Sequence, residues 1–391
     1  MLKSAYNPIK DSKHSPDDSD SSSASRRSVC MIVQQRDVHG GIAAVLSHYY
    51  GSFLEQDFRI TYIESYRDGS KFQKLTKALS CYLAFHKLLR TDPPKLVHIH
   101  ASFGPSFYRK LPVIRMAYAK KIPVVIHIHG SALQELYYDA SDRKKKLVRD
   151  TYAKCARMIV LSDEWKEKMS PIYPADRIRV VPNYSVEHAD LAAKYETTRL
   201  QKKQVLYLGR FDDLKGINEM PEIIRLVHDK HPEVTFLLCG DGETEKVSGP
   251  IAELGLDGIV SLPGWVNGEQ KEKALCESLL FFLPSHMEAM PVSVLEAMGY
   301  GLPIVSCKVG GIPKVVTAIN CGDSDNPSVQ TGNGFLTEPC DCAALAEAIC
   351  RFVKDPTLWK SASANSLRIV HERFGLEKHL KSVEEIYREL L

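Results

Sequence analysis

The sequence predicts an α/β protein with two Rossmann-like domains that face each other across a cleft. At 391 residues the chain is long enough for two hydrophobic cores. Short apolar and β-branched runs alternate with stretches of helical period, which is typical of parallel sheets with right-handed crossovers. This rhythm is lost at 183–203 and then begins again. Because ligands of open α/β sheets bind beyond the carboxyl ends of the strands, the cleft is the expected site.

The first domain is expected at residues 28–190, after a short tail. Residues 1–27 are polar, rich in Ser and Asp, and lack the apolar segment of a signal peptide, so we expect a disordered tail. Helical period separates the expected strands, for example over residues 71–90. The strands are expected at 29–34, 58–63, 95–100, 123–129, 157–162 and 177–182.

The second domain is expected at residues 204–375, after a linker at 191–203. The final segment, 376–391, has an amphipathic helical pattern and is expected to return to the first domain. The strands of the second domain are expected at 204–209, 234–240, 259–264, 279–284 and 302–307.

Positive charge is concentrated in the first half of the chain. Residues 30–190 carry 25 Lys and Arg against 16 Asp and Glu, whereas residues 191–391 carry 21 against 28. The first half is therefore expected to meet an anionic partner. No apolar run approaches the ~18–20 residues of a membrane span, so no transmembrane helix is expected.

The ten cysteines are scattered, and several lie in expected strands. This distribution is typical of reduced, buried thiols in a cytoplasmic protein. Cys340 and Cys342 form a Cys-x-Cys pair, but the sequence offers no second pair at metal-binding spacing. No metal site is therefore expected there.

Two glutamates eight positions apart stand at one strand-to-helix turn, in SHMEAMPVSVLEAMGYGLP at 285–303. Pro291 favours the start of a helix, so Glu288 would lie before its N-terminus and Glu296 about five residues inside. The free N–H groups between them would suit a diphosphate, and each carboxylate would accept hydrogen bonds from sugar hydroxyls. The alternative is an acid near a helix dipole and an unrelated surface residue.

Two cations stand on a glycine-flanked loop in LYLGRFDDLKGI at 206–217. Arg210 and Lys215 suit a pyrophosphate and would neutralise it as its bond to a sugar breaks. A solvated pair of surface charges is the alternative. Gly40 and Gly41, after the first strand, would let backbone approach a phosphate or an acceptor closely, although a plain tight turn would have the same sequence.

Residues at the ends of other strands complete the expected site. By alternation His127 and His129 share one face of their strand, and His129, at the strand's end, is the better candidate for hydrogen bonding to a sugar. A purely structural histidine is the alternative. Asp241, Gly242 and Trp265 also follow strands and could line the nucleotide part of the site.

Taken in order, these motifs resemble those of the retaining glycosyltransferases of family 4, which have the GT-B fold. Glu288 and Glu296 match the family's E-x(7)-E, and its G-R-x(4)-K-G begins here at Gly209. The similarity covers residues 28–390 and includes VVPN, LCGDG, LPGW and NGFLTEPCDCAALAEAI. The segment at 100–130 resembles the acceptor-side domain of the branch that builds bacterial surface polysaccharides.

The resemblance implies roles for individual residues. The first domain would hold the acceptor and the second the nucleotide-sugar donor. Arg210 and Lys215 would bind the donor diphosphate. Glu288 would contact the donor sugar and Glu296 the ribose, while His129 would hold the sugar from the first domain.

Backbone groups would complete the phosphate site in the same family. Gly41, preceded by Gly40, would border the phosphate and the acceptor. The family's Gly-Phe-Gly after the first glutamate is Ala-Met-Pro here, at 289–291. Proline has no N–H, so one backbone donor to the phosphate is lost. The donors would then be Met290, Val292 and Ser293.

The activity implied by the resemblance is metal-independent transfer of a hexosyl group with retained anomeric configuration. No cofactor is expected, and the co-substrate would be a UDP- or GDP-sugar. The acceptor would be a glycan or a polyprenyl-diphosphate-linked glycan. Asp323-Ser324-Asp325 resembles the metal motif of a different glycosyltransferase fold, but it stands in a polar loop away from the other motifs. It is not expected to bind a metal.

Basic residues on two helical stretches would dock a cytoplasmic protein on anionic lipid at the inner face of the cell membrane. Ordinary solvated helix faces are the alternative, and no nucleic-acid partner is expected. Two other functions stay open: a GT-B nucleotide-sugar epimerase, which needs no acceptor groove, and a catalytically silent nucleotide-sugar-binding protein. The basic residues are Lys71, Lys74, Lys77, Lys87 and Arg90, followed by Arg109, Lys110, Arg115, Lys120 and Lys121.

Overall fold

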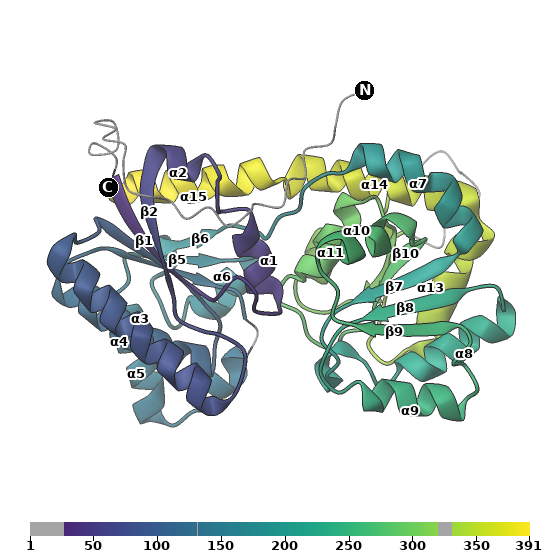
Figure 1. Cartoon of the computed structure of the whole chain (residues 1–391), viewed down its shortest axis with the longest axis horizontal. Coiled ribbons are helices and arrows are strands. Elements are labelled where there is room, and N and C mark those ends of the chain that lie inside the picture. Colours follow the sequence, from purple (N-terminus) through teal and green to yellow (C-terminus); the bar gives the residue numbers. More distant parts are fainter. Residues whose placement is uncertain (1–26, 131, 320–330) are drawn as a thin grey trace.

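Two six-stranded parallel sheets form the cores of two domains that lie side by side (Figure 1). The structure, a computed structural model, describes residues 27–130, 132–319 and 331–391. The strand order is β2-β1-β3-β4-β5-β6 in the first sheet and β12-β11-β10-β7-β8-β9 in the second. The predicted α/β class with two Rossmann-like domains is confirmed.

The first sheet begins close to where the sequence predicts it, and all six of its predicted strands are present. Its strands are β1 (Arg27–Val33), β2 (Phe58–Glu64), β3 (Leu96–Ala101), β4 (Val124–Ile128), β5 (Arg157–Val160) and β6 (Ile178–Val180). The helices between them are α1 (Gly41–Ser47), α2 (Leu54–Asp57), α3 (Lys71–Thr91), α4 (Pro105–Ala119), α5 (Asp142–Tyr152) and α6 (Asp163–Met169), with short turns at Gln134–Tyr138 and Ala175–Arg177.

The second sheet contains the five predicted strands and a sixth, β12, that the sequence analysis missed. The strands are β7 (Gln204–Leu208), β8 (Thr235–Cys239), β9 (Val260–Gly264), β10 (Leu280–Leu283), β11 (Ile304–Cys307) and β12 (Gly334–Thr337). The helices are α7 (Ala189–Lys202), α8 (Met220–Lys230), α9 (Glu245–Glu253), α10 (Gly268–Glu277), α11 (Val292–Gly299), α12 (Ile312–Val315), α13 (Cys342–Lys354), α14 (Pro356–Arg373) and α15 (Leu376–Leu390), with a short turn at Asp213–Lys215.

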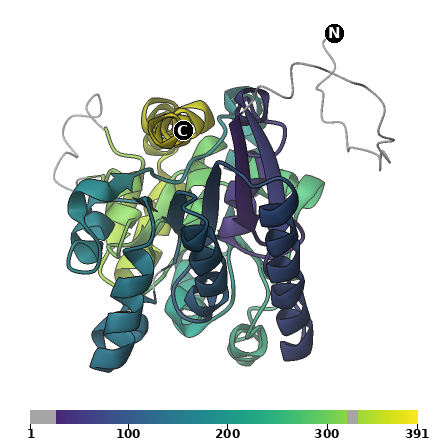
Figure 2. The ribbon, with the colours of Figure 1, turned by 90° about the vertical axis from the view of Figure 1, so that its left-hand side faces the viewer.

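Alternate residues of β1 belong to two different hydrophobic clusters of the first domain. Cys30 and Ile32 belong to the large cluster that includes residues of α3 and α4, whereas Val29 and Met31 belong to a second cluster with residues of α15. Figure 2 shows α15, in yellow, end on beside the purple strands, with the blue helices on the other side. The last helix of the chain therefore completes the core of the first domain.

Two expected boundaries are wrong. Arg27 is the first residue of β1, so the tail expected at 1–27 is too long by one residue; the rest of that tail lies outside the described residues. The linker expected at 191–203 is instead almost entirely the helix α7. The chain crosses between domains just before α7 and again at Gly375, where Ser185 N–H donates to the Phe374 carbonyl at 2.8 Å.

A buried arginine explains why the supposed linker is an ordered helix. Arg199, on α7, is fully buried, and its guanidinium donates to the carbonyls of Cys276 at 2.7 Å, Leu275 at 3.2 Å and Tyr300 at 2.9 Å. These carbonyls lie at the C-terminal ends of α10 and α11, where helices leave unpaired acceptors and negative partial charge. Burial lowers the pKa of this guanidinium to about 10, and it remains charged at neutral pH.

Candidate active site

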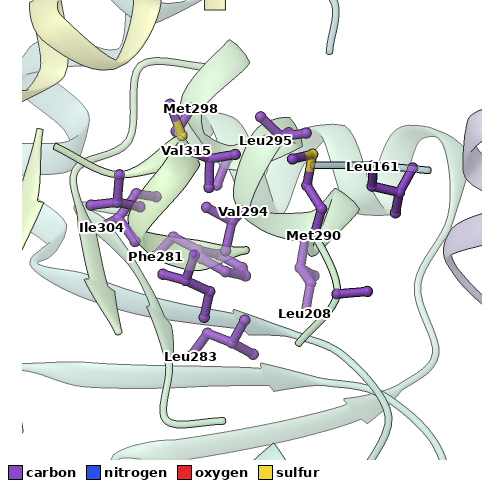
Figure 3. Packing of buried hydrophobic residues seen from close by; sticks show 14 of the residues in the cluster. Leu161, Leu208, Phe281, Leu283, Met290, Val294, Leu295, Met298, Ile304 and Val315 are labelled. Atoms are coloured by element: carbon purple, nitrogen blue, oxygen red, sulfur yellow. The ribbon is translucent and has the colours of Figure 1, made fainter. Parts of the chain in front are cut away.

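Helix α11 carries both glutamates of the predicted site and is anchored by its apolar face. Val294, Leu295 and Met298 belong to one hydrophobic cluster with Phe281 and Ile304 of the strands beside it (Figure 3). Pro291 is the residue before the helix, and no side chain caps the start of α11. The first N–H groups of α11 are therefore free to bind a ligand.

Lys215 and Glu288 form the central polar contact of the predicted site. The Lys215 ammonium lies 2.5 Å from Glu288 Oε1, and the Ser285 hydroxyl donates to the same oxygen at 2.8 Å. Glu288 is only 7% exposed, whereas Lys215 is more open. The structure thus brings together the two motifs that the sequence places 73 positions apart.

Two glycines make this contact geometrically possible. Gly216 adopts φ +69°, and a Cβ there would clash with the Pro284 carbonyl oxygen. Gly310 adopts φ +48°, and a Cβ there would clash with the Glu288 carbonyl oxygen. Both positions combine the left-handed backbone that glycine favours with an approach that excludes any side chain. The loops after β7, β10 and β11 can therefore converge around Glu288.

Glu296 has a partner that the sequence analysis missed. Lys271, on α10, lies 2.6 Å from Glu296 Oε1, and both side chains are partly exposed. Lys271 has no recognisable motif around it, so only the packing of α10 beside α11 reveals it. Each glutamate of the pair thus carries its own lysine.

The two domains meet at the start of α11. Asn183 is buried and donates to the Met290 carbonyl at 2.9 Å, and a Cβ on Gly41 would lie 3.4 Å from Val292. Gly40 has φ +133° and ψ 171°, a combination almost restricted to glycine. The contact places the start of α1, in the first domain, beside the start of α11, in the second.

Asp241 and Trp265 contact a residue of the first domain, His39. Its Nδ1 lies 2.7 Å from Asp241 Oδ2, and its ring stacks on Trp265 with centroids 4.3 Å apart and planes 4° apart. Gly242 follows with φ +116°, where a Cβ would clash with the Phe211 carbonyl. The predicted nucleotide-lining residues are therefore close to the first domain, and His39 is a further site candidate that the sequence analysis missed.

His129 belongs to a group of histidines on one face of the first sheet. His100 Nδ1 lies 3.0 Å from His129 Nε2, and the rings of His127 and His129 stack with centroids 4.1 Å apart. Burial, together with His379 nearby, lowers the pKa of His129 to about 3. A neutral imidazole at the end of β4 can accept or donate one hydrogen bond at each nitrogen.

Arg210 stands apart from these contacts. It is exposed, and within residues 27–130, 132–319 and 331–391 its guanidinium forms no ion pair. Among the described residues, no hydrogen bond or ion pair joins Arg210 or His129 to Glu288. The Asp-x-Asp at 323–325 lies outside the described residues.

Two parallel α/β domains with a site at their junction define the class of the protein, the GT-B fold. The fold is shared with the sucrose-phosphate synthase of Thermosynechococcus elongatus, with a TM-score of 0.74 at 18% identity over 93% of this chain and 99% of that one. It is also shared with Anabaena HepE, solved in complex with UDP and glucose, with a TM-score of 0.67 at 18% identity over 92% of this chain and 99% of that one.

The chain belongs to the glycosyltransferases. Residues 192–368 match the family described as Glycosyl transferases group 1, and residues 43–184 match Glycosyltransferase Family 4. Among curated relatives, the amylovoran biosynthesis glycosyltransferase AmsK of Erwinia amylovora is 25% identical over 261 residues. That match covers 65% of this chain and 60% of the relative's length. No helix in the described part of the chain is long and apolar enough to cross a membrane.

Proposed function

We propose that the protein transfers a sugar from a UDP- or GDP-sugar to a glycan or polyprenyl-diphosphate-linked acceptor in the synthesis of a surface polysaccharide. The observation that carries this proposal is the pair of the partly exposed Lys215 and the buried Glu288, beside the uncapped start of α11 where the domains meet. The relative AmsK acts in amylovoran biosynthesis, as its name says, and HepE was solved with UDP and glucose. The first supports a role in polysaccharide synthesis, and the second supports a nucleotide-sugar donor.

Binding of the donor would separate Lys215 from Glu288, because each would contact a different part of the donor. The donor diphosphate would take Lys215 and the first N–H groups of α11, and Arg210 would reach it from the exposed side of the same loop. Glu288 would then accept hydrogen bonds from sugar hydroxyls, and Glu296 from the ribose. The negative charge of Glu288 would thus be compensated by Lys215 before the donor binds and by the sugar hydroxyls after it binds.

We propose transfer with retained configuration and without a metal ion. The bond between the anomeric carbon and the diphosphate oxygen breaks while a bond to the acceptor oxygen forms on the same face. The acceptor's proton passes to the departing phosphate, and Lys215 and Arg210 stabilise the charge that develops there. His129, which is neutral, would hold the donor sugar by a hydrogen bond from the first domain.

A pocket beyond the ends of β3 and β4 supports an acceptor site in the first domain. It has a volume of about 590 Å³ and is lined by Gly104, Pro105, Tyr108, Arg109, Ala132, Glu135, Leu136 and Lys144. Apolar and aromatic walls suit an isoprenoid chain, and Arg109 and Lys144, which share the lining with Glu135, would meet its diphosphate. An epimerase would not need such a pocket.

The test combines a donor screen with product analysis. Released nucleoside diphosphate is measured for UDP- and GDP-sugars with and without acceptor, and the anomeric configuration of the product is read by NMR. We expect release that depends on acceptor, an α-product from an α-donor, and turnover in the presence of EDTA. An epimerised donor formed without acceptor, or donor binding without release, would instead support one of the two alternative functions.

We also propose that α3 docks the protein on the inner face of the membrane. Phe72, Leu75, Leu79 and Leu83 follow helical spacing along α3 and are 50–73% exposed. Such a stripe beside exposed cations is typical of an interfacial helix. Two of the basic residues expected to contact anionic lipid already have other partners. Lys77 pairs with Glu64, and Lys110 is buried against the Ser65 hydroxyl.

Co-sedimentation with anionic liposomes tests the contact with lipid. We expect Phe72→Ser with Leu83→Ser to weaken binding by about tenfold or more, because each apolar side chain contributes roughly 1.5–3 kcal/mol when buried. Lys120→Ser with Lys121→Ser, after the end of α4, removes charge and no apolar surface, and so measures the electrostatic part of binding separately. Unchanged sedimentation of the α3 variant would contradict the proposal.

A further inference from the structure

Three potential metal ligands from distant parts of the second domain meet outside the predicted active site. Glu219 precedes α8, His286 follows β10, and Cys340 follows β12. His286 Nε2 lies 3.1 Å from Glu219 Oε1, Cys340 Sγ lies 3.4 Å from the same oxygen, and Cys340 Sγ lies 3.6 Å from His286 Nε2. We refer to these residues as the Glu-His-Cys cluster.

The three separations match the edges of a tetrahedral metal site. Zinc lies about 2.0–2.3 Å from imidazole nitrogen, carboxylate oxygen and thiolate sulfur, which places such ligands roughly 3.4–3.6 Å from one another. The separations in the cluster are 3.1, 3.4 and 3.6 Å, so an ion would require shifts of only a few tenths of an ångström.

Two features of the cluster are costly without a ligand. Glu219 Oε2 is buried and has no hydrogen-bond partner in the described chain, whereas Oε1 of the same carboxylate has two close neighbours, so an ion bound by both carboxylate oxygens would also compensate Oε2. Cys340 has φ +64°, which is uncommon for any residue with a side chain. A positive φ turns the Cys340 backbone so that its thiol meets the other two residues, and such strain is typical of functional sites.

We propose that Glu219, His286 and Cys340 bind a zinc ion, with the fourth position open to solvent. Mixed nitrogen, oxygen and sulfur ligands favour zinc over the harder magnesium and calcium ions. The thiol of Cys340 loses its proton to solvent when the bond to the metal forms, and His286 binds as the neutral imidazole. Two negative charges, from thiolate and carboxylate, then balance the charge of the ion.

The ion would connect three segments around the donor site without taking part in the transfer. His286 stands two residues before Glu288, and its backbone N–H donates to the Leu214 carbonyl at 2.8 Å, next to Lys215. Holding His286 to the start of α8 and to the loop after β12 would therefore restrain both loops that carry the Lys215–Glu288 pair. The site does not depend on the proposed transfer reaction.

The Cys-x-Cys pair supplies a matched control. Cys342 is two positions after Cys340 in the sequence, yet it lies outside the cluster, and its thiol is directed to Glu222. In the absence of metal the Cys340 thiol donates to Glu219, which raises the pKa of the thiol, so metal binding must displace that proton. Cys340→Ser removes a proposed ligand, whereas Cys342→Ser removes a neighbouring thiol that packs against the core at the start of α13 and lies outside the cluster.

Titration of the full-length protein with Co²⁺ and Zn²⁺ tests the site. We expect one equivalent of Co²⁺ to produce a sulfur-to-cobalt charge-transfer band that one equivalent of Zn²⁺ removes. Cys340→Ser should lose the band and weaken zinc binding by more than the roughly 10–100-fold that removal of an outer-shell partner costs. Cys342→Ser should keep the charge-transfer band and the affinity for zinc. Glu219→Gln should weaken the binding of zinc.

A second measurement needs no variant. Zinc should protect Cys340 from alkylation in the wild-type chain, with the modified peptide identified by mass spectrometry. Absence of stoichiometric binding, an unchanged band in Cys340→Ser, equal losses in both cysteine variants, or unprotected Cys340 would each overturn the proposal. Donor turnover is not the readout, so failure here leaves the proposed transfer function untouched.

Discussion

The pairing of Lys215 with Glu288 leads to a double-mutant cycle with Lys215→Met and Glu288→Gln. Removal of one partner from a buried ion pair costs about 3–5 kcal/mol because the remaining charge is poorly solvated. Here Ser285 still donates to Glu288 and Lys215 is partly exposed, so we expect Lys215→Met to lower the free energy of unfolding by about 2 kcal/mol.

The double variant removes the charge together with its partner. We expect its stability to lie within about 1 kcal/mol of wild type, so that the coupling free energy of the cycle is at least about 1 kcal/mol. Urea denaturation followed by circular dichroism measures all four proteins. Lys246→Met is the control, since Lys246 pairs with Asp213 of the same loop but both side chains are exposed; it should change stability by less than about 1 kcal/mol.

Activity should not follow stability in this cycle. If Lys215 stabilises the departing diphosphate, its loss should reduce kcat by roughly 10²–10³, equivalent to about 3–4 kcal/mol of transition-state stabilisation. The double variant should stay inactive although its stability recovers. Near-normal turnover in Lys215→Met, or a double variant that is as unstable as the sum of the two single variants, would refute the reasoning.

Two further predictions concern buried polar groups of the fold. Arg199→Met removes the guanidinium that donates to three helix-end carbonyls and should cost roughly 3 kcal/mol in urea denaturation, whereas Lys202→Met on the same helix should cost under about 1 kcal/mol because its ion pair is exposed; similar losses in both would contradict the assigned role. Burial lowers the pKa of His98 and His129 to about 3 and of His379 to about 4, so the unfolded chain binds protons that the folded chain does not. Stability should therefore fall as the pH drops below about 6.5, the ordinary pKa of histidine, and the fall should be shallower in a His98→Asn variant; a melting temperature that stays constant between pH 7 and pH 5 would exclude this linkage.

Hydrophobic patterning was sufficient to predict most of the fold. Eleven of the twelve strands were predicted because buried parallel strands read as continuous apolar runs. The missed strand, β12 at Gly334–Thr337, has only two apolar residues, Phe335 and Leu336, between a glycine and a threonine. It is a strand because it pairs with β11, and that pairing is a long-range contact.

The helix α7 was also missed, because its residues were predicted to form a linker. The rhythm of strands is lost at 183–203, and so residues 191–203 were assigned to a linker, although Leu191, Tyr195 and Leu200 of α7 pack against the core. Arg199 stabilises the helix through carbonyls at the ends of α10 and α11, which are 76–101 positions away in sequence. The local sequence pattern cannot identify a polar residue whose hydrogen-bond partners are this far away along the chain.

The sequence by itself determined the two α/β domains and the two motifs that carry Lys215 and Glu288, because residue type and local spacing specify strands, helices and turns. The partners of the site residues were decided only by tertiary structure. Lys271 beside Glu296, His39 on Trp265, and the meeting of three ligand-bearing loops at Cys340 all depend on how the loops at the carboxyl ends of the strands converge. That convergence is a property of chain packing, which brings together residues with no local relation in the sequence.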